Sequence, residues 1–139
     1  MSKSKRYQLE KKIIVFLSSG LFAVSGFCAG DVQAAPVFGP GTGNNSTVAG
    51  EDNTVDGAGS SAVGFNNEVD GATANAFGVG NLASGAGASA FGAYNKATER
   101  NSSAFGYRSN ATGEFSSAFG YENTATKNTA NALGFYTRA

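Results

Sequence analysis

Histidine and tryptophan are absent from the 139-residue sequence, which has only one cysteine, one methionine and two prolines. Without histidine, a serine or cysteine nucleophile lacks its usual imidazole base, and the common zinc sites lose a usual ligand. Because Cys28 is the only cysteine, no disulfide can form within the chain. We therefore expect a protein that is not an enzyme, that acts on no small-molecule substrate, and that holds no cofactor or metal.

Charged residues are also scarce, at 14% of the chain. From residue 35 onward, five basic residues stand against eight acidic ones, which gives a net charge of −3. Five acidic residues precede the first base of this part, Lys96: Glu51, Asp52, Asp56, Glu68 and Asp70. A chain without a basic patch does not fit binding of nucleic acid or of an anionic membrane. The neighbouring carboxylates lie beside Asn and Gly, and we interpret them as solvated turn residues rather than as a catalytic or calcium-binding pair.

The first 34 residues are organised like a secretory signal peptide. A basic segment at residues 3–12 precedes an apolar stretch at 13–30, and Val32-Gln33-Ala34 follows as a cleavage site that ends in a small residue. We predict cleavage between Ala34 and Ala35 and export of the protein. The alternative is that residues 13–30 remain as a membrane-spanning anchor, which the glycines within this stretch disfavour.

Residues 35–46 form a lead-in rich in proline and glycine. Its glycines neither follow a strand nor begin a helix, so they do not fit a phosphate-binding loop. We interpret the segment as a cap or a flexible tip over the part that follows, because bare strand edges invite aggregation.

From Thr47 to Ala139 the sequence repeats every fourteen residues without insertion or deletion. The fourth position of every repeat holds a glycine: Gly50, Gly64, Gly78, Gly92, Gly106, Gly120 and Gly134. The second and ninth positions hold alanine or valine throughout. The third position holds Ala49 and Val63 and then larger side chains: Phe77, Phe91, Phe105, Phe119 and Leu133. So regular a repeat is typical of a solenoid, and we predict one domain over residues 47–139 with an incomplete last coil.

The length of the period indicates which solenoid this is. Helical hairpin repeats need more than thirty residues and leucine-rich repeats at least twenty. Fourteen residues are enough for two short strands and two tight turns, so we predict an all-β parallel β-roll. The first strand should cover the first five positions and the second should surround the ninth. Asn at the seventh position and Gly at the eleventh are residues that tolerate positive φ, and Glu99 and Lys127 at the eleventh position indicate turns that differ or are strained.

Side chains alternate between the two faces of a strand. A coil of fourteen residues has room inside for little beyond alanine or valine, so the alanine columns should lie inside and the Phe column outside. Burying one Phe contributes roughly 1.5–3 kcal/mol, and a soluble protein seldom leaves such a stripe in water. The pattern therefore predicts self-association through this column in a closed cyclic oligomer. The alternative is a monomeric, wider roll with the aromatic side chains inside.

The Ser-Ala-Phe-Gly core at residues 103–106, the period of fourteen and the small-residue columns resemble the head repeats of the YadA-like trimeric autotransporter adhesins. The resemblance covers residues 47–139. It implies a left-handed β-roll, a homotrimer joined through the Phe column, and a role in bacterial attachment to host cells or extracellular matrix. This sequence departs from the usual pattern in having Phe where Val or Ile is common. Because it ends within a coil at Ala139, we expect a fragment or a truncated reading frame.

Two further functions fit the repeats less well. The chain could be a rigid spacer that binds nothing itself and only extends another domain of a surface protein. A solenoid hydrolase or lyase would need charged side chains converging in a groove, and this roll is too thin to form one. We therefore expect an exported virulence protein, anchored at the outer membrane if a stalk and anchor follow and otherwise secreted.

Overall fold

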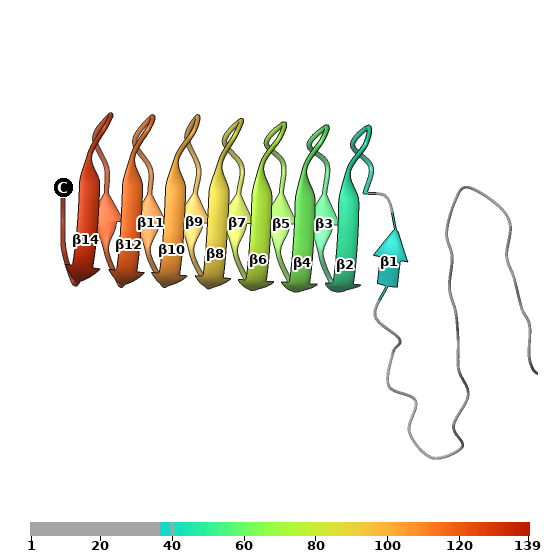
Figure 1. The fold of residues 1–139 in the computed structure, drawn as a ribbon, viewed down its shortest axis with the longest axis horizontal. Helices are drawn as coiled ribbons and strands as arrows, with labels where there is room; N and C mark the ends of the chain where they lie inside the picture. Colours follow the sequence, from blue (N-terminus) through green and yellow to red (C-terminus); the bar gives the residue numbers. More distant parts are fainter. Residues whose placement is uncertain (1–36, 40) are drawn as a thin grey trace, which may run out of the picture.

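The computed structural model describes residues 37–39 and 41–139, and this part of the chain forms a β-solenoid (Figure 1). The predicted signal peptide at 1–34 and its cleavage site between Ala34 and Ala35 lie outside the described residues. Among the residues that are described, no helix is long and apolar enough to cross a membrane.

Each complete coil contains one long and one short strand, as the period predicted, and the last coil contains the long strand alone. The long strands are β2 (Thr47–Glu51), β4 (Ser61–Phe65), β6 (Asn75–Val79), β8 (Ser89–Ala93), β10 (Ser103–Tyr107), β12 (Ser117–Tyr121) and β14 (Asn131–Phe135). The short strands are β3 (Thr54–Val55), β5 (Glu68–Val69), β7 (Leu82–Ala83), β9 (Lys96–Ala97), β11 (Asn110–Ala111) and β13 (Thr124–Ala125). The repeat positions one to five and eight to nine are therefore the strands.

The strands form two parallel sheets, one of long and one of short strands. Neighbouring strands pair in strict register at an offset of one repeat, so that Phe105 lies between Phe91 and Phe119. Each column of the sequence thereby becomes a row of side chains along the solenoid axis. The regular period is thus converted into ladders of identical groups at the strand spacing of about 4.8 Å.

The core between the two sheets consists of small side chains. Alanines at the second and ninth positions are almost completely buried from Ala62 to Ala132, and the largest fully buried apolar side chains are Val55 and Val69. The Phe column lies outside, with Phe77 exposed to 39%. The prediction of an alanine interior is confirmed, and the alternative of a wider roll filled by aromatic rings is wrong.

The turns correct one expectation. Positive φ occurs at the sixth and thirteenth positions, for example at Arg108 (φ 50°) and Asn101 (φ 53°), and not at the Asn of the seventh or the Gly of the eleventh position. Coils approach closely at the glycines of the eleventh position: a Cβ on Gly85 would lie 2.1 Å from the carbonyl oxygen of Glu99. The turns at Glu99 and Lys127 form the same bond as the others, from the N–H three residues later to their carbonyl oxygens, at 3.1 Å each.

The lead-in covers the first coil. The strand β1 (Val37–Gly39) pairs antiparallel with β2, and the N–H of Thr42 donates to the carbonyl oxygen of Val55 at 2.9 Å. Both strands of the first coil therefore have backbone partners on their outer side. This arrangement satisfies edge groups that would otherwise be free to pair with another chain.

Candidate interaction surface

The outer face of the long-strand sheet is shaped by the glycine column at the fourth position. Gly106 has a φ of 114°, which side-chain-bearing residues rarely adopt. A Cβ there would also lie 2.0 Å from the carbonyl oxygen of Gly120 in the next coil. The collision is with the neighbouring coil and not with the coil interior. The column therefore remains a strip of side-chain-free backbone, exposed at Gly92, Gly106 and Gly120.

A buried ladder of asparagines at the seventh position (the Asn ladder) holds this face in place. The side-chain nitrogen of Asn95 donates to the carbonyl oxygens of Phe91 at 2.9 Å and of Gly106 at 2.8 Å. The side-chain oxygen of Asn81 accepts the backbone N–H of Asn95 at 3.0 Å. Asn95 thus ties its own long strand to the coils before and after it.

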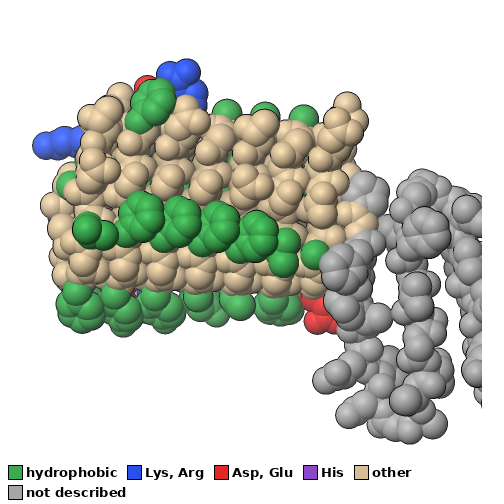
Figure 2. Space-filling view, viewed as in Figure 1, with side chains coloured by type: hydrophobic (Ala, Val, Ile, Leu, Met, Phe, Trp, Pro, Cys, Tyr) green, Lys and Arg blue, Asp and Glu red, His purple; other side chains and the backbone are tan. Residues whose placement is uncertain are grey.

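The predicted interface residues form a continuous row on the outside of the sheet, which we call the Phe ladder: Phe77, Phe91, Phe105, Phe119 and Leu133. The rings of Phe91 and Phe105 are stacked with centroids 4.8 Å apart and planes at 2° to one another. Figure 2 shows this row along the middle of the long-strand face. Stacking covers the faces of the rings, while their edges point away from the roll.

A second aromatic row follows at the fifth position, and we call it the Tyr ladder: Phe65, Val79, Tyr107, Tyr121 and Phe135. Tyr107 and Tyr121 stack with centroids 5.2 Å apart, and Tyr121 and Phe135 with centroids 5.0 Å apart. In Figure 2 a second apolar row runs along the lower margin of the same face. Sequence reasoning did not assign these residues to a site, although the fifth-position aromatics at Tyr107, Tyr121 and Phe135 were the signal for it.

Polar groups flank the Tyr ladder in the sixth position. Arg108 lies 5.2 Å from the ring centroid of Tyr107 and 3.7 Å from the carboxylate of Glu122. Tyr136 contacts Tyr121 edge-on, with ring centroids 5.6 Å apart. Desolvation and then the Glu122 carboxylate raise the pKa of the Tyr136 phenol.

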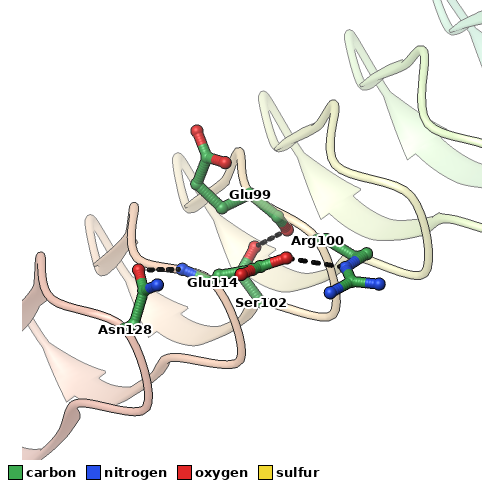
Figure 3. A network of polar contacts seen from close by, with 5 residues as sticks. All are labelled: Glu99, Arg100, Ser102, Glu114 and Asn128. Carbon is green, nitrogen blue, oxygen red and sulfur yellow. Dashed lines mark hydrogen bonds and ion pairs between the residues drawn. The ribbon is translucent and has the colours of Figure 1, made fainter.

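The turns between the short and long strands carry a separate polar network (Figure 3). Arg100 pairs with Glu114 in the next coil at 2.7 Å, and the N–H of Glu114 donates to the side-chain oxygen of Asn128 at 3.3 Å. The Ser102 hydroxyl donates to the carbonyl oxygen of Glu99 at 2.7 Å. The carboxylate and guanidinium of this network are partly or largely exposed, so they connect coils without forming an enclosed site.

The acidic residues of the first coils lie at the surface, and Glu51 is the strand partner of Phe65 at the start of the Tyr ladder. Glu51, Asp52, Asp56, Glu68 and Asp70 are all exposed. Within residues 37–39 and 41–139, no three of the side chains that could ligate a metal come together. The groups that the fold does concentrate are aromatic, and their arrangement suits contact with another macromolecule.

Comparison with known proteins agrees with this geometry. A family model described as the YadA head domain repeat matches the chain at residues 42–67, 83–109, 97–123 and 111–137. No significant match was found among curated proteins or among solved structures.

Proposed function

The chain belongs to the family of YadA head domain repeats, and on this premise we propose that it is the head of a trimeric adhesin that attaches bacteria to host extracellular matrix or cell surfaces. The family suggests an exported bacterial surface protein with a trimeric head. Attachment to a particular host surface is the part that we add.

The observation that carries the proposal is the exposed Phe ladder. Phe77 is exposed to 39% and Phe119 to 36%, although both lie on strands that are paired on both sides. An apolar stripe of this length favours burial against another chain, and the trimer number follows from the family. We propose that the homotrimer buries Phe77, Phe91, Phe105, Phe119 and Leu133 between its chains.

Such a head would act by binding and not by catalysis. The sequence offers no histidine, and its only cysteine precedes the repeats. We therefore propose that the protein is not an enzyme and needs no cofactor. Its place would be the outside of the cell, reached through the signal sequence proposed at residues 1–34.

The oligomer can be tested on residues 35–139 by sedimentation equilibrium. We expect the wild-type protein to associate and Phe105→Asp to remain monomeric with its strand content retained, because one carboxylate per chain would enter an apolar interface. Thr112→Asp, an exposed change in the same coil, is the matched control and should still associate. If the wild-type protein remains a folded monomer even when fused to a trimeric coiled coil, the proposed interface is wrong.

Adhesion needs a separate test, because a rigid spacer would also trimerise. Solid-phase binding of the trimeric head to immobilised extracellular matrix proteins should exceed binding to albumin. Binding equal to albumin for every matrix protein tried would favour the spacer function.

A further inference from the structure

The Tyr ladder has no partner in the proposal made so far. It lies on the same strands as the Phe ladder, two residues further along, and the glycine column separates the two rows. Phe65 is exposed to 46% and Tyr121 to 38%, so this second stripe, like the first, presents aromatic surface to solvent. Covering the Phe ladder alone would leave a second aromatic stripe in water.

The repeat distance restricts what can cover both stripes. Rings recur once per coil from Phe77 to Phe119 in the Phe ladder and from Tyr107 to Phe135 in the Tyr ladder, with centroids 4.7 Å apart at Phe105 and Phe119 and 5.2 Å apart at Tyr107 and Tyr121. A partner that contacts every ring must repeat at the same strand spacing along the axis. A second copy of this chain, lying side by side and in parallel, has that spacing by construction.

Symmetry then requires two different surfaces. In a closed ring of more than two identical chains, every chain contacts one neighbour through one surface and the other neighbour through another. The two ladders are such a pair, since they lie on one sheet and are parallel to one another.

We propose that the Tyr ladder of one chain packs against the Phe ladder and the exposed glycine column of the next chain, so that the two ladders form the two halves of one repeating interface. This inference rests on the self-association proposed above and specifies its geometry. The contact begins at the second coil, where Phe65 and Val63 are the first large members of the two rows. In the first coil these positions hold Glu51 and Ala49, which do not extend the apolar stripe.

The two halves can be identified by pairing single cysteines. In the full chain carrying Cys28→Ser, Phe91→Cys marks the Phe ladder, and Ala93→Cys marks the fifth position of the same coil. Each variant is oxidised alone and in an equal mixture, and covalent dimers are resolved by mass. We expect dimers mainly in the mixture, joining residue 91 of one chain to residue 93 of another, since a disulfide requires close Cβ atoms.

The outcomes separate this inference from the proposed function. Dimers formed by Phe91→Cys alone, with none gained in the mixture, would mean that Phe ladders face one another and would overturn the inference while leaving an oligomer. An oligomer without any cross-link between residues 91 and 93 would overturn it too. A monomer by sedimentation would contradict both proposals.

A second variant tests the Tyr ladder without cysteines. Tyr107→Asp should weaken association at least about tenfold, equivalent to about 1.4 kcal/mol, as expected for a charge placed in a buried contact. Thr112→Asp, in the same coil but outside both ladders, should leave association unchanged. If Tyr107→Asp associates as the control does, the Tyr ladder faces solvent and the inference is wrong.

Discussion

The Asn ladder and the Phe ladder repeat with the same period along the same coils, yet they lie in opposite environments. Asn67, Asn81, Asn95 and Asn123 are exposed by at most 1%, whereas Phe77 is exposed to 39%. A side-chain amide has both donors and an acceptor, so a stack of amides can satisfy itself along the axis. A stacked aromatic ring is covered only on its faces, and its edges require another surface. Stacking of identical coils thus satisfies the hydrogen-bonding groups of the Asn ladder within one chain, but it leaves the ring edges of the Phe ladder exposed.

The strongest test of the internal contacts is Gly106→Val. Positive φ and the close carbonyl oxygen of Gly120 both oppose a side chain there. We expect a loss of about 3 kcal/mol or more in the free energy of unfolding, measured by urea denaturation. Thr112→Val, at an exposed position, should change it little. Equal stability of the two variants would contradict the strand geometry described here.

Removing one amide tests the Asn ladder itself. Asn95→Ala leaves the partly buried carbonyl oxygens of Phe91 and Gly106 without their side-chain donor, and it removes the buried donor to the side-chain oxygen of Asn81. A buried group that loses its partner costs about 1–3 kcal/mol, so we expect destabilisation in that range. Asn110→Ala, at a partly exposed position on the short-strand sheet, is the control and should be nearly neutral. A neutral Asn95→Ala would mean that the ladder contributes no stability.

The ladder has one natural interruption, at Ser109. Its hydroxyl donates to the carbonyl oxygen of Gly120 at 3.2 Å. The side-chain oxygen of Asn81 accepts the backbone N–H of Asn95, but Ser109 has no such oxygen in place for Asn123. Within the described part of the chain, the backbone N–H of Asn123 therefore has no acceptor. Ser109→Asn should supply this acceptor and raise the free energy of unfolding by about 1 kcal/mol, seen as a higher melting temperature. A lower melting temperature would show that the larger side chain does not fit between Asn95 and Asn123.

The smallest effect is expected on the outside of the turns. Glu114→Gln removes the ion pair with Arg100, whose side chain is 59% exposed. Exposed pairs contribute about 0–1 kcal/mol and are screened by salt. The variant should therefore lose a few tenths of a kcal/mol at most, and only at low salt. If Glu114→Gln lost more free energy of unfolding than Asn95→Ala, and did so at every salt concentration, the exposed ion pair would stabilise the protein more than the buried Asn ladder does. That result would contradict the expected order of the two effects.

Much of the fold could be predicted because each position of the repeat has the same environment in every coil, so the residue types that recur at a position indicate what that environment is. Ala104 between Ser103 and Phe105 indicates little about burial by itself, but an alanine recurring at the second position of six coils does. The strand positions, the small interior and the outward Phe ladder followed from that column pattern and are confirmed by the structure. The Tyr ladder was missed because Ala93 interrupts the row of large side chains at the fifth position. The row is recognised only in the structure, where Tyr107, Tyr121 and Phe135 stack on one another.

The sequence by itself determined the period, the two strands of each coil and the alanine interior, because these depend on residue size and spacing within a single repeat. The tertiary structure decided which of their possible roles the turn residues take. Asn and Gly are residue types that tolerate positive φ, yet neither Asn95 nor Gly85 adopts it. Asn95 instead hydrogen-bonds to the coils on both sides, and Gly85 makes room for the carbonyl oxygen of Glu99. Both roles depend on atoms one repeat away in the chain, and only the stacking of coils brings those atoms within reach.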